Sequence, residues 1–245
     1  MPQIEKMKKF LLSALTVGVL AGFGGHACAA EDRSDIKVGG HITPGACDIE
    51  ISGGGMFDYG DMTVASLTAV NPDAQNKPTQ LGKKSLDFTM SCDNKVRVAF
   101  TMVDARSGSH SSDTTGTTLF GTAPPSPNVR YKLGLGLADN KGKIGMYAVG
   151  FVDGLTVDGQ DASIIVDDGT GVWKARPDVG PSGLFARDAS RRLGALIDGD
   201  SITNGPSLGK EYAGKLSVDV VLTKLSALSK DFELDGLATM EIRYL

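Results

Sequence analysis

The side chains best suited to redox or metal chemistry are two cysteines, Cys47 and Cys92, each at the end of a segment in which apolar and polar residues alternate. Neither belongs to a Cys-x-x-Cys motif, and no histidine stands at a spacing that would complete a zinc site with them. A structural disulfide is therefore predicted, with no metal and no cofactor. Since disulfides persist in oxidising compartments, the pairing indicates an exported protein.

Ser207 is a second candidate for chemistry, because residues 205–209 match the Gly-x-Ser-x-Gly pattern. That pattern forms a nucleophile elbow only between a buried strand and a helix, whereas Asn204 and Pro206 favour a turn. The histidines His41 and His110 fall in a predicted strand and a predicted loop, so neither is placed to act as a base. The chain is expected not to be an enzyme.

Two further motifs carry weaker signals. Residues 198–200 read Asp-Gly-Asp, like the start of a calcium loop, but Ile202 holds the next ligand position and no glutamate stands at the twelfth. A turn is predicted there. Trp173, the only tryptophan, suits either packing or a sugar-stacking platform at the edge of a loop.

The N-terminus has the composition of a secretory signal peptide, with three lysines at positions 6, 8 and 9 before the apolar run 10–23. Small residues at 27–30 place the predicted cleavage after Ala29 or Ala30, so Cys28 leaves with the signal. The apolar run is too short to span a bilayer, and no later segment is long and apolar enough. No membrane insertion is therefore expected once residues 1–30 are removed.

Charge and composition exclude several classes of protein. Removing residues 1–30 takes three lysines and one glutamate from the 25 basic and 29 acidic residues, which leaves 22 against 28, a net charge of −6. A mildly acidic chain with no basic run is not expected to bind nucleic acid. The 32 glycines follow no fixed period and aromatic residues are scarce, which favours strands and loops.

Four segments show the alternation of strands with one buried face: residues 85–92, 96–102, 216–222 and 238–244. Only residues 93–95 separate the first two, so a tight hairpin is predicted between them. In the last segment the apolar row is Ala238, Met240, Ile242 and Tyr244. Further strands are expected at residues 36–42, continuing into 47–51, and around 131–137, 144–152 and 163–166.

Residues 104–128 and 167–182 lack such periodicity and are rich in Ser, Gly, Thr and Pro, which predicts exposed loops. After the second loop, Phe185, Ala189, Leu193 and Ile197 recur at helical spacing. A short helix is predicted there, with the arginines at 187, 191 and 192 on its solvated face.

Segments near the first cysteine resemble a known family. The order Val38-Gly39-Gly40-His41-Ile42-Thr43-Pro44-Gly45-Ala46-Cys47 is similar to the first strand of chaperone–usher fimbrial subunits, and residues 85–92 are similar to the strand that carries their second cysteine. A closer likeness is to the GltF-like family of exported proteins, a domain of unknown function related to those subunits. It rests on residues 42–47 together with Gly53-Gly54-Gly55, Asp58-Tyr59-Gly60 and Gln80-Leu81-Gly82-Lys83-Lys84.

The fimbrial resemblance implies an immunoglobulin-like sandwich that lacks its last strand, with an apolar groove beside the C-terminal strand. A periplasmic chaperone, and later a neighbouring subunit, adds a strand to such a groove. The implied partner edge is Ala238, Met240, Ile242 and Tyr244. Few residues precede residue 36 after the predicted cleavage, so the chain would receive a strand rather than donate one, or would complete its own sandwich.

These expectations combine into one prediction. Residues 31–245 should form a single all-β, immunoglobulin-like (pilin-type) sandwich with one disulfide and an inserted region at about 104–214. The expected function is that of a fimbrial or fimbria-like structural or adhesion protein, in the periplasm or at the cell surface of a Gram-negative bacterium, with a periplasmic chaperone and other fimbrial subunits as partners. The alternative is a self-complete periplasmic binding module whose loops 104–128 and 167–182 recognise a small molecule or glycan.

Overall fold

The computed structural model describes residues 46–113, 115–121, 129–175, 183–228 and 231–245. The predicted signal peptide and the predicted strand at 36–42 lie outside the described residues. No helix within the described ranges is long and apolar enough to cross a membrane.

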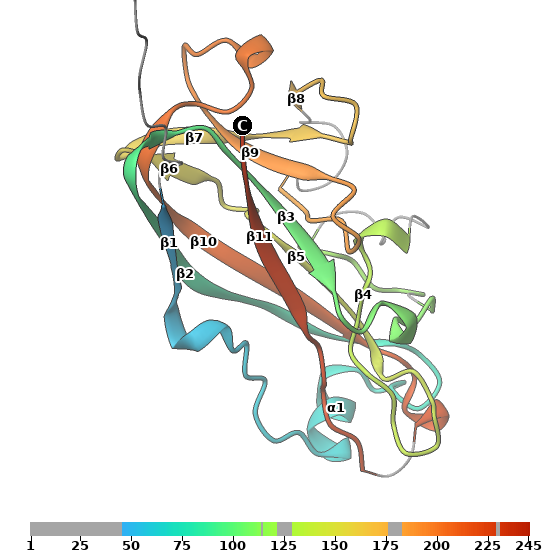
Figure 1. The fold of residues 1–245 in the computed structure, drawn as a ribbon. Helices are drawn as coiled ribbons and strands as arrows, with labels where there is room; N and C mark the ends of the chain where they lie inside the picture. Colours follow the sequence, from blue (N-terminus) through green and yellow to red (C-terminus); the bar gives the residue numbers. More distant parts are fainter. Residues whose placement is uncertain (1–45, 114, 122–128, 176–182, 229–230) are drawn as a thin grey trace, which may run out of the picture. The chain divides into compact units, whose positions relative to one another are not determined.

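Antiparallel strands dominate the described chain and belong to one sheet (Figure 1). Its main path runs β1-β2-β10-β6-β7-β9-β3-β11, while β4 pairs with β5, β5 with β10, and β8 with β7. The strands are β1 Cys47–Ile51, β2 Thr79–Val96, β3 Val98–Asp104, β4 Leu133–Gly134, β5 Gly145–Gly150, β6 Leu155–Val157, β7 Gln160–Asp167, β8 Lys174–Ala175, β9 Arg192–Ile197, β10 Gly209–Leu222 and β11 Ala238–Tyr244. One α-helix, α1 Val64–Val70, and five short 3-10 turns accompany them in the described part: Ser52–Gly55, Ser107–Ser109, Val129–Tyr131, Ile202–Asn204 and Leu225–Ala227.

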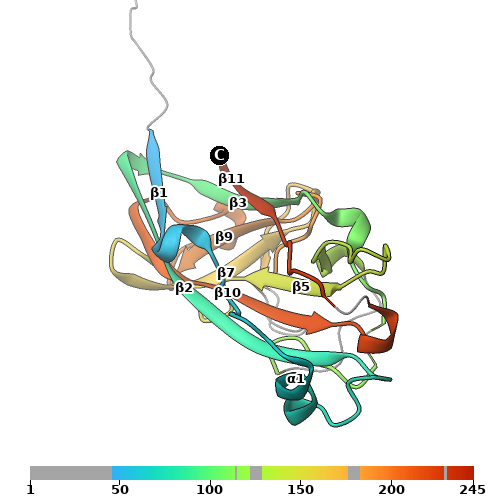
Figure 2. The same cartoon turned by 90° about the horizontal axis from the view of Figure 1, so that it is seen from below.

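A chain of aromatic rings fills the core. Phe88 on β2 and Phe100 on β3 meet edge-on with centroids 5.5 Å apart, and Phe151 lies 5.0 Å and 5.5 Å from them. All three side chains are buried. Because β2 and β3 contribute to the same core without pairing, the sheet must curl so that their inner faces oppose each other, which both views show (Figures 1 and 2). The predicted all-β sandwich is confirmed.

The alternating segments become strands, as predicted. Residues 238–244 form β11 with the predicted bounds, residues 47–51 form β1, and residues 85–92, 163–166 and 216–222 lie within β2, β7 and β10. The segments predicted at 96–102 and 144–152 extend beyond β3 and β5, which begin at Val98 and Gly145. Around 131–137 the strand is shorter than predicted, since it comprises Leu133–Gly134 with an isolated bridge at Leu137. The inserted region supplies β4 to β9, and these strands join the same sheet.

The predicted hairpin between residues 85–92 and 96–102 is wrong. Strand β2 continues through residues 93–95, and a single residue, Arg97, separates it from β3. Strand β2 pairs with β1 and β10, whereas β3 pairs with β9 and β11. The chain therefore crosses from one layer to the other at Arg97, which keeps both apolar rows on the core.

The predicted helix at 185–197 is also wrong. Residues 192–197 form β9, which pairs with β7 over six positions. Ala189 has a φ of 55°, a conformation that interrupts a right-handed helix. Gly194 packs against Pro206 so closely that a β-carbon at position 194 would stand 2.4 Å from the proline ring. Tertiary pairing therefore overrides the helical spacing.

The segment after β3 is less exposed than predicted. Ser109, Ser111, Thr117 and Leu119 are buried, and Leu119 joins a second apolar cluster with Met146, Ala148, Leu184 and Val221 on the outer face of β5 and β10. The buried carboxylate of Asp219 accepts the backbone N–H of Phe120 at 2.6 Å. This segment therefore covers the sheet.

Candidate functional site: an unpaired strand edge beside an apolar groove

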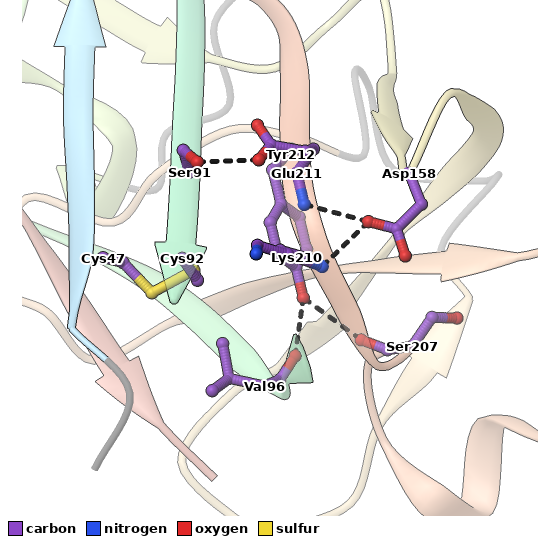
Figure 3. The surroundings of a disulfide bond; sticks show 9 residues. All are labelled: Cys47, Ser91, Cys92, Val96, Asp158, Ser207, Lys210, Glu211 and Tyr212. Carbon is purple, nitrogen blue, oxygen red and sulfur yellow. Dashed lines mark hydrogen bonds between the residues drawn. A yellow bond between two sulfur atoms is a disulfide. The ribbon is translucent and has the colours of Figure 1, made fainter. Parts of the chain in front are cut away.

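A disulfide fixes one boundary of the site. Cys47 and Cys92 occupy directly opposed positions of β1 and β2, with a Cα–Cα distance of 4.0 Å (Figure 3). On its other side β2 pairs with β10, and the Tyr212 hydroxyl donates to the Val96 carbonyl at 2.8 Å. The predicted disulfide is confirmed, and it ties β1 to the longest strand pair of the sheet.

Strand β11 forms the opposite boundary and pairs with β3 alone. Bonds at both ends of this ladder identify the residues that face β3: Ala105 N–H donates to the Leu237 carbonyl at 2.9 Å, and Leu245 N–H donates to the Arg97 carbonyl at 3.0 Å. Because antiparallel bonds alternate along a strand, the odd-numbered residues direct their backbone groups to β3. The even-numbered residues direct theirs away from it, and no described strand pairs with that edge.

The same four even-numbered residues carry the apolar row. Ala238, Met240 and Ile242 are half-buried and pack against the core, while Tyr244 is 47% exposed. None of the seven residues of β11 is fully buried. The structure thus brings the four predicted edge residues together on one row of an unpaired strand. The side chains of that row are less buried than those of a strand in the interior of a sheet.

An apolar groove of about 410 Å³ lies between β11 and the segment that follows β1. One wall comes from Ile51, Gly54, Gly55, Met56, Phe57 and Tyr59, and the other from Leu234, Gly236, Leu237, Ala238 and Met240. Strands β3, β5 and β10, with the residue after β4, supply the floor: Met102, Leu135, Tyr147, Val149, Leu216, Val218 and Val220.

Tyrosine hydroxyls are the only side-chain polar groups among these lining residues. The Tyr59 hydroxyl donates to the Gly82 carbonyl at 2.8 Å, and burial, followed by the charge of Asp219, raises the pKa of Tyr59 above its usual range. Burial likewise raises the pKa of Tyr147, with the nearby Asp104 adding to the effect. Both phenols therefore stay protonated. The groove is suited to binding rather than to acid–base chemistry.

Ser207 lies elsewhere and has structural partners. Its hydroxyl is buried, accepts the Ile197 N–H at 2.8 Å and donates to the Asp200 carboxylate. Of the described histidines, His110 contacts Ser107 and Arg187. The short 3-10 segment Ile202–Asn204 lies between the two predicted turns, at 198–200 and 205–209. The absence of enzymatic activity stays a prediction.

The arginines do not form the solvated face that the sequence predicts. Arg191 is 3% exposed and its guanidinium lies 3.5 Å from the Asp168 carboxylate. Arg192 is paired with the fully buried Asp167 and stacks on Trp173, with 5.7 Å between guanidinium and ring centroid. These contacts join the ends of β7 and β9 to the loop between β7 and β8. Trp173 therefore serves packing here.

Comparison with known proteins identifies similar sequences. Residues 36–148 match the model of a family described as "Protein of unknown function (DUF1120)". The chain is 27% identical over 263 residues to "Protein GltF" of Escherichia coli (strain K12), an alignment that covers 97% of this chain and 99% of GltF. The chain is therefore similar to GltF over nearly its whole length. The predicted resemblance to GltF-like proteins is confirmed, and neither description states a function.

The two comparisons cover different parts of the site in this GltF-like chain. The family match contains the disulfide, the first groove wall and three of the seven floor residues, Met102, Leu135 and Tyr147, but it ends before β10 and β11. The similarity to GltF extends over nearly the whole chain, so it includes the unpaired strand as well.

Proposed function

We propose that this GltF-like chain is an exported, fimbria-like structural or adhesion protein that acts by accepting an extended strand of a partner along β11. The partner proposed is a periplasmic chaperone, followed by a neighbouring fimbrial subunit. The observation that carries the proposal is the coincidence of two features on one row of β11: the backbone groups of all four residues are directed to an unpaired edge, and the side chains of Ala238, Met240 and Ile242 pack against the core.

A strand is the ligand that satisfies both features at once. Its backbone offers N–H and C=O groups at the spacing that β11 requires, and its alternate side chains enter the groove. Seven residues of β11 correspond to about 23 Å of extended chain at roughly 3.3 Å per residue. An edge of that length beside an apolar groove favours aggregation unless another segment covers it. Compact apolar ligands would leave the backbone groups unsatisfied.

The disulfide and the signal-like N-terminus support the same compartment. An oxidised Cys47–Cys92 pair is stable outside the reducing cytoplasm, and the N-terminal sequence favours export. Periplasm or the cell surface of a Gram-negative bacterium is therefore the proposed location.

A matched pair of substitutions tests the proposal. Ile242→Asp places a charge on the row of β11 that packs against the core, whereas Thr239→Asp places the same charge on the exposed outer row. After periplasmic co-expression with the candidate chaperone, Ile242→Asp should abolish co-purification and Thr239→Asp should preserve it. Equal recovery of the complex with both variants would contradict strand pairing at this edge.

The groove volume supports a second candidate function. About 410 Å³ lies within the range of pockets that hold small molecules, roughly 300–1,000 Å³. A self-complete periplasmic module that binds a small molecule or glycan would refold alone as a stable monomer. An open sandwich would refold poorly or self-associate, so unassisted refolding followed by sedimentation separates the two functions.

A further inference from the structure

One wall of the groove is attached to the sheet differently from the other. The strap, residues 52–62, leads from β1 toward α1 (Figure 1). It begins with Gly53, Gly54 and Gly55, whose φ angles are 63°, 63° and 77°. A β-carbon at Gly54 or Gly55 would meet no atom within 4 Å. The backbone conformation, rather than crowding, is therefore what favours glycine at these positions, and glycine permits large changes of φ.

Beyond these glycines the strap makes no ladder with its neighbours. Outside the 3-10 turn Ser52–Gly55, the backbone–backbone hydrogen bond found for the described strap is the turn bond from Met56 N–H to the Gly53 carbonyl, 3.3 Å. The Gly60 N–H is satisfied within the strap, by the Asp58 carboxylate at 2.7 Å. Movement of residues 57–62 would therefore break no backbone–backbone hydrogen bond to the described strands, which keeps the free energy of local opening low.

Side chains hold the strap closed. Phe57, Tyr59 and Met62 are half-buried against the core. The Tyr59 hydroxyl donates to the carbonyl of Gly82 on β2 at 2.8 Å. Lys84 supports this bond from the same strand, since its ammonium lies 4.9 Å from the Tyr59 ring centroid and 2.5 Å from the Asp58 carbonyl. Tyr59 thus joins the strap to β2.

The size of the groove makes movement of this wall necessary for the proposed partner. A volume of about 410 Å³ suits a compact small molecule, whereas a strand that pairs along all of β11 is larger. The β11 wall is fixed by its ladder to β3 over seven positions. The strap has no such ladder, so it is the wall that can yield.

We propose that the strap is a gate for the groove: it turns about Gly53–Gly55, is latched by the Tyr59–Gly82 hydrogen bond, and opens to admit the partner strand. The gate proposal rests on the proposed function, because the gate regulates access to the site at which the partner strand would bind. Its opening, however, is a property of the free protein and can be measured without a partner.

Thiol labelling of the purified full chain tests the gate. Phe57→Cys places a reporter under the strap, and Met90→Cys places one in the buried centre of β2. With a disulfide-exchange reagent, Cys at 57 should react by local opening, at a rate insensitive to low denaturant. Cys at 90 should react only through global unfolding. If both reporters respond to denaturant alike, the gate is overturned.

The latch is tested by adding Tyr59→Phe to the reporter. Loss of one neutral hydrogen bond should raise the labelling rate at position 57 about three- to tenfold. Tyr212→Phe is the matched control, since it removes a 2.8 Å hydroxyl–carbonyl bond on β10. If Phe57→Cys fails to fold, Met62→Cys serves as the reporter. An unchanged rate in Tyr59→Phe overturns the gate even where Ile242→Asp abolishes partner binding, whereas retained binding in Ile242→Asp overturns the proposed function itself.

Discussion

The ring of Tyr147 lies directly against the α-carbon of Gly236, so that a β-carbon at position 236 would stand 2.9 Å from the ring. Tyr147 belongs to the groove floor and Gly236 precedes β11, so this contact sets how deeply the chain enters the groove before the unpaired strand begins. A side chain at position 236 would lift β11 away from the floor or displace the ring.

Gly236→Ala should therefore lower the free energy of unfolding by about 1–3 kcal/mol, the usual cost of overpacking. Urea denaturation of the purified protein measures the change. Gly108→Ala is the control, because a β-carbon there meets nothing within 4 Å, and its effect should stay within about 0.5 kcal/mol. Equal effects of the two substitutions would contradict the close contact at Gly236.

Removing the disulfide should loosen β1. The double variant Cys47→Ala/Cys92→Ala loses a cross-link between residues 45 positions apart. The expected loss of unfolding free energy is about 2–4 kcal/mol, measured by urea denaturation without reductant. Dithiothreitol should lower the stability of the wild type and leave the double variant unchanged. A reductant effect on the double variant would show that another thiol is involved.

The surroundings of Asp158 imply that the protein loses stability in acid. The Lys95 ammonium at 2.8 Å, with the backbone N–H groups of Glu211 and Lys210, holds the pKa of Asp158 at about 2 (Figure 3). A carboxyl with a depressed folded-state pKa stabilises the fold above its unfolded value, about 4, and loses that contribution as pH falls toward 2.

Asp158→Asn keeps an oxygen for the two N–H groups but removes the charge. The stability difference between wild type and Asp158→Asn should be constant above about pH 5 and shrink between about pH 4 and 2. Thermal unfolding at a series of pH values gives this difference directly. A difference that grows as pH falls has the wrong sign for this arrangement.

The Asp219 carboxylate should hold in place the segment that covers the outer face of β10. Its carboxylate accepts Phe120 N–H and, at 3.1 Å, the Gln80 amide, which in turn accepts Thr118 N–H. Asp219→Ala leaves these buried donors without an acceptor, so a loss of about 1–3 kcal/mol is expected. Limited proteolysis should then cut within residues 105–121. Asp219→Asn, which retains an acceptor, should be cut more slowly.

Strand positions with strict alternation could be predicted from the sequence, because a half-buried strand has a side-chain period of two. Residues 238–244 are the clearest case. Pairing could not be predicted in the same way: residues 93–95 look like a hairpin turn, but the local pattern contains no information on which layer receives β3. The apolar spacing of residues 185–197 fits a helix equally well, and only pairing with β7 selects the strand.

Part of the candidate site could be predicted from the sequence. The four edge residues follow from alternation and from the fimbrial resemblance, whereas the strap and the floor residue Tyr147 come from distant segments that only the fold brings together. The one local signal for the strap is the run Gly53-Gly54-Gly55 followed by Tyr59. That run marks unusual backbone conformation, but it does not reveal that the next residues form a groove wall.

Amide hydrogen exchange along β11, resolved residue by residue by NMR, tests the central claim most directly. In the free protein the N–H groups of Thr239, Glu241 and Arg243 should be protected by β3, while those of Met240, Ile242 and Tyr244 should exchange rapidly. Addition of the partner strand should protect the second set. Protection of all six amides in the free protein would mean that the edge is already paired, and it would contradict an open acceptor groove.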